Sequence, residues 1–164
     1  MPEIEYVEDS MESEELLERL CPPVRNWFKD KFPDFTEPQK VAIPRILNGE
    51  HLLLCSPTGS GKTLTAFLTI IDDLVRRSLD GSLPDAVQCV YISPIKALAN
   101  DIEKNLLGPL GEIKERYLPS RAKEIKVGLR TGDTPQSERE KMLRKPPHIL
   151  ITTPESMGLG LASK

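Results

Sequence analysis

Cysteine and histidine are scarce in this sequence, which limits the metal and redox chemistry that it could carry. The three cysteines, Cys21, Cys55 and Cys89, form no Cys-x-x-Cys pair, and His51 and His148 have no partner at the spacing of a metal site. Two of the cysteines lie within apolar, strand-like runs. We therefore expect buried free thiols in a reducing compartment, and no metal held by cysteine or histidine.

Long hydrophobic runs are also missing. No apolar stretch approaches the roughly 18 residues of a membrane-spanning helix, and the sequence begins with acidic residues where a signal peptide would be basic. The composition, 38% hydrophobic and 29% charged, is that of an ordinary globular protein, and 164 residues suffice for one domain with a real core. These absences predict a cytoplasmic protein that has no part in a membrane.

Charge is distributed unevenly along the chain. The first 20 residues hold eight acidic residues and one basic residue, so the remainder is net basic although the whole chain carries −3. Residues 114–145 hold ten Lys and Arg against five Asp and Glu. This stretch fits either a phosphate-facing surface or an ordinary solvated one, and charge by itself favours the latter. The pattern predicts an acidic extension over residues 1–20 and a folded domain over residues 21–164.

Hydrophobic periodicity predicts an alternation of strands and helices beyond residue 50. Helices are expected at residues 13–20, 24–31, 37–47, 62–79, 95–107 and 135–145, and strands at residues 52–55, 87–92, 125–129 and 149–152. The run at 52–55 is continuously apolar, as in strands buried on both faces. Because strand and helix alternate, the predicted class is α/β, with a mostly parallel sheet, helices on both faces, and ligands at the carboxyl ends of the strands.

The turn after the first predicted strand has the composition of a phosphate-binding P-loop. It reads Ser56-Pro57-Thr58-Gly59-Ser60-Gly61-Lys62-Thr63, with Ser56 where the strict pattern has glycine. Gly59 and Gly61 let the backbone curl so that successive N–H groups point at phosphate oxygens. Lys62 would reach the β and γ phosphates, and the Thr63 hydroxyl would bind Mg²⁺. The loop therefore predicts an ATP and Mg²⁺ site, with Lys62 and Thr63 as its catalytic candidates.

Five segments in order resemble the motifs of superfamily 2 helicases. Residues 35–39 (Phe-Thr-Glu-Pro-Gln) resemble the Q motif, in which a glutamine reads the adenine edge, and residues 57–63 resemble motif I. Motifs Ia, Ib and Ic are matched by residues 91–99 (Tyr-Ile-Ser-Pro-Ile-Lys-Ala-Leu-Ala), 130–133 (Arg-Thr-Gly-Asp) and 151–156 (Ile-Thr-Thr-Pro-Glu-Ser). Residues 134–139 and 146–150 add to this, and the whole most resembles the large helicase-related (Lhr) family of DNA helicases, from about residue 35 to 156.

The resemblance implies a RecA-like P-loop NTPase domain and assigns roles beyond the P-loop. Gln39 joins the nucleotide-binding residues. The nucleic-acid contacts that it implies are Ser93, Pro94 and Lys96 in motif Ia, Arg130, Thr131 and Gly132 in motif Ib, and Thr152, Thr153, Pro154 and Glu155 in motif Ic. Short hydroxyls, backbone amides and two cations at strand ends suit phosphate contacts that read no bases.

Each of these residues also has a plainer interpretation. Ser93, Thr134 and Thr153 precede predicted helices and suit helix caps. Gln39 could be an exposed helix residue, and Phe35 or Trp27 could belong to the core rather than stack on adenine. A helix N-terminus is itself a phosphate site, so the cap and contact interpretations are compatible.

The sequence predicts the ATP-binding, amino-terminal part of an ATP-dependent DNA helicase that acts on nucleic acid, in particular single-stranded DNA. The alternatives are a stand-alone module that binds nucleotide or nucleic acid without turnover, and another P-loop enzyme such as a small kinase. In the family, an Asp-Glu pair that holds Mg²⁺ and a second RecA-like domain lie beyond motif Ic, and this sequence ends at Lys164 before them. We therefore expect the chain alone to bind nucleotide and to hydrolyse it hardly at all.

Overall fold

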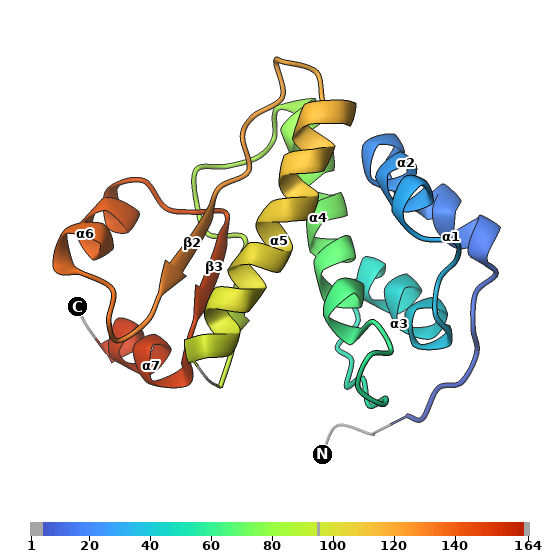
Figure 1. Ribbon diagram of the computed structural model, residues 1–164, viewed down its shortest axis with the longest axis horizontal. Coiled ribbons are helices and arrows are strands. Elements are labelled where there is room, and N and C mark those ends of the chain that lie inside the picture. Colours follow the sequence, from blue (N-terminus) through green and yellow to red (C-terminus); the bar gives the residue numbers. More distant parts are fainter. Residues whose placement is uncertain (1–4, 95, 163–164) are drawn as a thin grey trace. The chain divides into compact units, whose positions relative to one another are not determined.

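A computed structural model describes residues 5–94 and 96–162, and of residues 96–101 and 103–105 it describes the backbone alone. The chain divides into two compact units, residues 1–76 and 77–164. The long helix α4 (Lys62–Asp80) contains the boundary between them (Figure 1). The predicted P-loop therefore belongs to the first unit, and the three predicted nucleic-acid motifs belong to the second.

The first unit is helical before the P-loop. Its helices are α1 (Ser13–Arg19), α2 (Pro22–Lys31) and α3 (Glu37–Leu47), close to the predicted ranges. Pro22 and Pro23 stop α1 and open α2, where the missing N–H of proline leaves no hydrogen bond unmade. α1 packs against α3, with Leu16 and Ile43 fully buried. The second half of the acidic extension is therefore a packed helix.

Aromatic side chains of α2 and of the segment after it form a cluster. Phe35 stacks on Phe28 with their ring centroids 4.0 Å apart, and Trp27 meets Phe32 edge to face at 5.8 Å. Phe35 and Trp27 are only 5% and 4% exposed. Both belong to the core, which is the plainer of the two interpretations considered for them.

A buried carboxylate joins α4 to the junction between α1 and α2. Asp72 is fully buried, and its two oxygens accept hydrogen bonds from the Cys21 amide and from Arg76 Nε, each at 2.6 Å. Arg76 also donates to the carbonyl of Arg19. Burial and the negative charge of Asp72 raise the pKa of the Cys21 thiol to about 12, so this thiol stays protonated at neutral pH.

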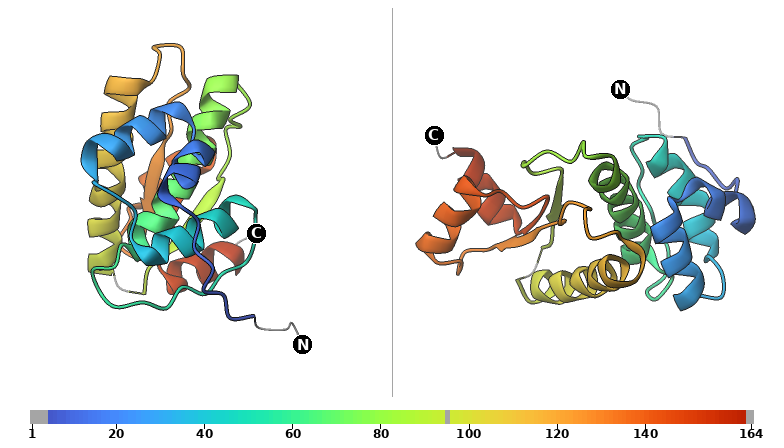
Figure 2. Two further views of the ribbon diagram at one scale, coloured as in Figure 1. Left: turned by 90° about the vertical axis from the view of Figure 1, so that its right-hand side faces the viewer. Right: turned by 90° about the horizontal axis from the view of Figure 1, so that it is seen from above.

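The second unit contains a parallel sheet of three strands within the described residues: β1 (Cys89–Ile92), β2 (Val127–Arg130) and β3 (Ile149–Thr152), in the order β1-β3-β2. The register pairs Ile92 and Arg130 with the same residue, Thr152, so the three strands end level. α5 (Lys96–Tyr117) packs on β2 and β3. Figure 2 shows α5 on one side of these strands and α7 (Pro154–Ala162) on the other. The parallel α/β arrangement predicted from the alternation is confirmed.

The helix α5 of this unit is longer than predicted. α5 continues ten residues past 107, through Gly108 and Pro109, because Leu106, Leu110 and Ile113 extend one buried stripe that outweighs the weak positions. Ile95, the predicted first residue of this helix, lies outside the described residues. α6 (Gln136–Arg144) matches its prediction closely and buries no side chain. Among the described residues no helix is both long and apolar enough to cross a membrane.

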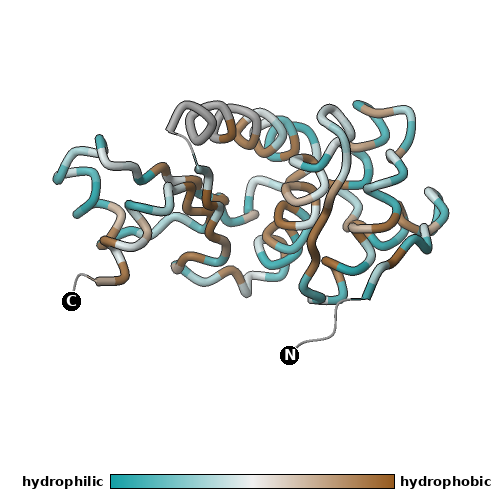
Figure 3. The backbone as a smooth tube through the Cα atoms, turned by 90° about the horizontal axis from the view of Figure 1, so that it is seen from below, coloured by the Kyte–Doolittle hydropathy of each residue, from teal (hydrophilic) through white to brown (hydrophobic). Residues whose placement is uncertain are grey.

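The strand predicted at residues 52–55 does not form. These residues make no backbone hydrogen bond within the described part of the chain, and Leu53 is 87% exposed. An apolar run becomes a strand only where neighbouring strands take up its N–H and C=O groups, and the described sheet ends with β1 and β2. Figure 3 shows apolar backbone along α4 and through the strands.

The cysteines are correspondingly less buried than predicted. All three are free thiols, but Cys55 is exposed and Cys89 is half-buried, so only Cys21 has the expected environment. Cys55 was predicted to be covered because its run was predicted to be a buried strand. Burial still raises the pKa of the Cys89 thiol.

His148 makes the stability of the second unit depend on pH. The imidazole is fully buried and its Nδ1 accepts the Lys126 amide at 2.9 Å. Burial, followed by the positive charges of Lys123 and Lys126, lowers its pKa below 6.5, and Asp85 opposes this. The folded state therefore stays neutral at a pH where the unfolded chain binds a proton, so stability is lost as pH falls below about 6.5.

We expect urea denaturation between pH 7.5 and 5.5 to show this loss, at up to about 1.4 kcal/mol per pH unit. The ion-paired carboxylates Asp85 and Glu124 titrate below this range, since hydrogen bonds from Lys123 and Lys114 lower their pKa values. A His148→Asn variant should be less stable at pH 7.5, but its free energy of unfolding should not change with pH over the same range. If the free energy of unfolding of the unchanged chain is equally independent of pH, the assignment of the loss to His148 is wrong.

Candidate nucleotide and nucleic-acid sites

The P-loop forms a turn that opens directly into α4. Gly59 and Gly61 adopt φ values of +80° and +86°, a region that side chains with a Cβ rarely occupy, as their assignment predicted. α4 begins at Lys62, and its first intrahelical bond runs from the Thr65 amide to the Gly61 carbonyl at 2.9 Å. The amides of the four residues before Thr65 have no acceptor within the described residues. Such amides at the positive end of a helix form an anion site.

The Lys62 side chain folds back onto its own loop. Its ammonium group donates to the carbonyl oxygens of Ser56 and Pro57, at 2.5 and 2.6 Å. The hydroxyls of Ser56 and Ser60 share a hydrogen bond of 2.6 Å across the loop. Ser56 therefore contributes a link that the glycine of the strict pattern would not supply. The Thr63 side chain, in the first turn of α4, is exposed.

The Q-motif segment is in direct contact with the P-loop. Thr36 Oγ1 donates to the Ser60 carbonyl at 2.8 Å, and Gln39 Nε2 lies 3.5 Å from the Gly61 carbonyl. Gln39 Oε1 accepts the Thr36 amide at 2.9 Å. Gln39 is only 2% exposed, so it is not the exposed helix residue considered as an alternative. A Cβ at position 61 would lie 2.6 Å from Gln39 Nε2, which gives Gly61 a packing requirement besides its φ angle.

The ends of the three strands bring motifs Ia, Ib and Ic together. Ser93, Thr131 and Thr153 each follow the last residue of a strand, and those last residues are level in the register. The Ser93 amide donates to the Thr152 carbonyl at 2.9 Å, and Thr152 Oγ1 donates to the Arg130 carbonyl at 2.7 Å. The three motifs therefore share one edge of the sheet, as their strand-end positions predicted.

At this edge the four predicted hydroxyl contacts are buried. Ser93, Thr131, Thr152 and Thr153 are between 1% and 7% exposed. Thr153 Oγ1 accepts the Ser156 amide at 3.4 Å in the first turn of α7, which is the helix-cap interpretation. These side chains shape the backbone at the edge, and contacts with a ligand would come from the backbone or from the exposed residues.

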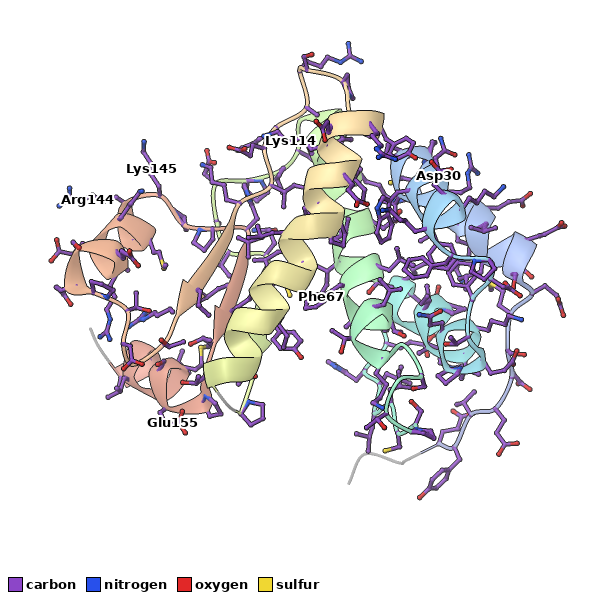
Figure 4. All side chains as sticks on the ribbon, viewed as in Figure 1. Asp30, Phe67, Lys114, Arg144, Lys145 and Glu155 are labelled. Atoms are coloured by element: carbon purple, nitrogen blue, oxygen red, sulfur yellow. The ribbon has the colours of Figure 1, made fainter. Side chains whose placement is uncertain are left out.

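The exposed predicted residues at the edge are Pro94, Gly132, Pro154 and Glu155. Arg130 is half-buried, and its guanidinium lies over α7, with Nη1 3.2 Å from where a Cβ on Gly160 would stand. The side chain of Lys96 lies outside the described residues. Figure 4 shows Glu155 on the outside of the first turn of α7.

The loop after β2 uses two side chains to which the sequence assigned no ligand role. Thr134 was expected to cap α6, but Pro135 is the capping residue, and Thr134 Oγ1 accepts the Thr131 amide at 2.8 Å instead. Arg139 of α6 donates to three carbonyls of the loop: Nε to Thr134 at 2.8 Å, and Nη2 to Gly132 at 2.9 Å and to Thr131 at 3.3 Å. An arginine three residues into a polar helix carries no sequence signal for such a contact.

Comparison with known families agrees with the motifs. The profile of the DEAD/DEAH box helicases matches residues 36–162, most of the chain. The chain belongs to the DEAD/DEAH box helicase family. The match runs from the segment before the Q-motif glutamine through α7 and so contains the P-loop and the three strand-end motifs.

Several of the similar proteins within that family are Lhr-type helicases. The chain is 48% identical over 165 residues to the ATP-dependent helicase Lhr-Core of Methanocaldococcus jannaschii, covering 99% of this chain and 20% of the relative. It is 43% identical to the Lhr helicase/uracil glycosylase of Escherichia coli, covering 88% of this chain and 10% of the relative. The chain thus spans a fifth or less of the length of these relatives.

Solved structures place the fold in the same group. The structure of Mycobacterium smegmatis helicase Lhr bound to ssDNA and AMP-PNP is 45% identical, with a TM-score of 0.79 over 90% of this chain and 18% of that chain. The yeast DEAD-box splicing factor Prp28, 21% identical with a TM-score of 0.72, shares the fold. The RecA-like class predicted from the sequence is therefore confirmed.

Proposed function

We propose that this chain is the ATP-binding amino-terminal part of an ATP-dependent DNA helicase of the Lhr type, one that couples hydrolysis to unwinding. The observation that carries the proposal is the start of α4, where the amides before Thr65 have no acceptor within the described residues and two glycines adopt positive φ values. Four unsatisfied amides at the positive end of a 19-residue helix favour a polyanion such as a triphosphate.

The residues of the loop fit bound Mg·ATP. The Lys62 ammonium group would release the carbonyls of Ser56 and Pro57 and donate to β and γ phosphate oxygens instead. The phosphate oxygens would accept from the same ammonium N–H groups that the two carbonyls occupy now. The exposed Thr63 hydroxyl would hold Mg²⁺, which supplies charge neutralisation at the phosphates. Gln39, buried against Gly61, would read the adenine edge after giving up its present contacts with the backbone.

Hydrolysis of ATP requires groups around the γ phosphate that these residues do not supply. Phosphoryl transfer depends on groups positioned around the γ phosphate, and one missing arginine finger costs about 10³ to 10⁵ in rate. We propose that a second RecA-like domain of the longer protein completes the site, that movement on nucleic acid requires it, and that the protein works in the cytoplasm. The chain alone should bind ATP with little turnover.

The shared edge of motifs Ia, Ib and Ic is the proposed nucleic-acid contact. Ser93, Thr131 and Thr153 lie at level strand ends, and Arg130 supplies a cation beside them. The similar helicase Lhr of M. smegmatis has been solved bound to ssDNA and AMP-PNP, which supports single-stranded DNA as the partner and ATP as the nucleotide. Contacts of this kind are made to the sugar-phosphate backbone and position a strand without reading its bases.

The salt dependence of binding tests this contact. If the edge holds three or four phosphates, the logarithm of the affinity for oligothymidine should fall against the logarithm of salt concentration with a slope of about −2 to −3. Removal of one phosphate contact by Arg130→Ala should reduce the slope by about 0.7. Fluorescence anisotropy over a range of salt concentrations measures both. A flat response would leave these residues with their helix-capping roles alone.

A further inference from the structure

Residues 131–134, which form the turn after β2, are held by Arg139 in addition to the backbone hydrogen bond that closes the turn. The guanidinium of Arg139 donates hydrogen bonds to the carbonyls of Thr131, Gly132 and Thr134. Thr134 adds two more bonds: its Oγ1 accepts the Thr131 amide, and its own amide donates to the Thr131 carbonyl at 3.2 Å. Most polar backbone groups of the turn are therefore satisfied locally.

The turn presents an exposed backbone donor at Gly132. Gly132 is exposed, and its amide has no acceptor within the described residues, although its carbonyl is bound by Arg139. Three carbonyl oxygens, which would repel a phosphate, are turned toward the guanidinium. An exposed amide N–H without nearby carbonyl oxygens is attractive to an anion. This amide is two residues after Arg130, whose strand end is level with those that lead into motifs Ia and Ic.

We propose that Arg139 is a positioning residue, whose guanidinium holds residues 131–134 in the conformation that presents the Gly132 amide to a phosphate of the bound strand. The inference rests on the proposed function and adds to it a residue outside the strand-end motifs. Arginine suits this role because its planar fork offers several N–H groups in fixed directions, whereas the ammonium group of lysine is a point charge on a flexible stem.

Two substitutions separate positioning from a direct ionic contact. Arg139→Lys keeps the charge but loses the fork, so the turn should populate other conformations and affinity for oligothymidine should fall roughly tenfold. Arg139→Ala should weaken binding to a similar degree, with the slope against salt unchanged. A direct phosphate contact predicts instead near-normal binding by the lysine variant and a slope reduced by about 0.7 in the alanine variant.

Arg144 provides the matched control. It lies on the same helix and is exposed, and its side chain makes no hydrogen bond or ion pair within the described residues; Figure 4 shows it extending from the end of α6. Arg144→Ala removes the same charge without touching the turn and should bind within about twofold of the unchanged chain.

Hydrogen exchange and chemical rescue give readouts that a general loss of stability would not reproduce. Amides of residues 131–134 should exchange faster in both Arg139 variants, while those of residues 149–152 stay protected. Free guanidinium at millimolar concentration should restore binding to Arg139→Ala, and sodium at equal ionic strength should not. Equal binding by the unchanged chain and Arg139→Lys would overturn this inference alone, whereas no binding by the unchanged chain would overturn the proposed function and this inference with it.

Discussion

Lys62→Ala should abolish the rise in melting temperature that Mg·ATP produces in the unchanged chain. A nucleotide at a hundred times its dissociation constant stabilises the folded state by about 2.7 kcal/mol. Lys62 is the only cation of the P-loop segment, and its ammonium group already donates hydrogen bonds to two carbonyls of the loop. Without it, the β and γ phosphates would lose the charge that offsets their own, and the affinity should fall out of the measurable range.

The control for this variant is Lys29→Ala. Lys29 is exposed on α2 in the same unit, and its side chain makes no hydrogen bond or ion pair within the described residues. Its loss should leave the nucleotide-induced shift intact. Differential scanning fluorimetry with and without Mg·ATP compares the three proteins, and a full shift in Lys62→Ala would place the nucleotide somewhere other than this loop.

Asp72→Ala should lower the free energy of unfolding of the first unit by about 2 to 4 kcal/mol. The substitution leaves the buried Cys21 amide without its acceptor and takes the carboxylate partner from Arg76. The estimate lies below that for a fully buried pair because the Arg76 side chain is 47% exposed and water can solvate it. The same change removes the negative charge that helps to raise the pKa of the Cys21 thiol.

Two further variants identify the cause. Asp72→Asn keeps an oxygen for the Cys21 amide and should lose less than the alanine variant. Glu18→Ala removes an exposed carboxylate of α1 in the same unit and should change stability by no more than about 0.5 kcal/mol. Urea denaturation measures all three, and equal losses for Asp72→Ala and Glu18→Ala would contradict a specific role for the buried carboxylate.

More of the candidate site than of the sheet could be predicted from the sequence. The Gly59 and Gly61 positions, the start of α4 and the sharing of one edge by three motifs all follow from local patterns, because turn chemistry and strand order are encoded near the residues concerned. Burial at residues 52–55 depends on strands that hydrogen-bond from elsewhere in the chain. Local apolarity was therefore a poor guide to that segment and to the environment of Cys55.

At the edge, the sequence predicted the kind of role that a side chain plays but not its hydrogen-bond partner. Thr134 was recognised as a residue with a capping hydroxyl, yet its partner is the Thr131 amide and not the helix that follows. Arg139 donates three hydrogen bonds to a turn five to eight residues before it, although a count of charges treats this arginine as one more surface cation. The Lys62, Thr63 and Gln39 assignments remain predictions that concern a bound nucleotide.

The most direct test of the account is an NMR titration of the isotope-labelled chain with Mg·ATP, which reads the amide resonances of Gly61, Lys62 and Thr63. Capture of phosphates by these donors predicts saturable downfield shifts at one equivalent, since each amide gains a charged acceptor that it lacks within the described chain. Saturation elsewhere with these three resonances unmoved, or no saturation at all, would contradict the claim that the start of α4 binds the nucleotide.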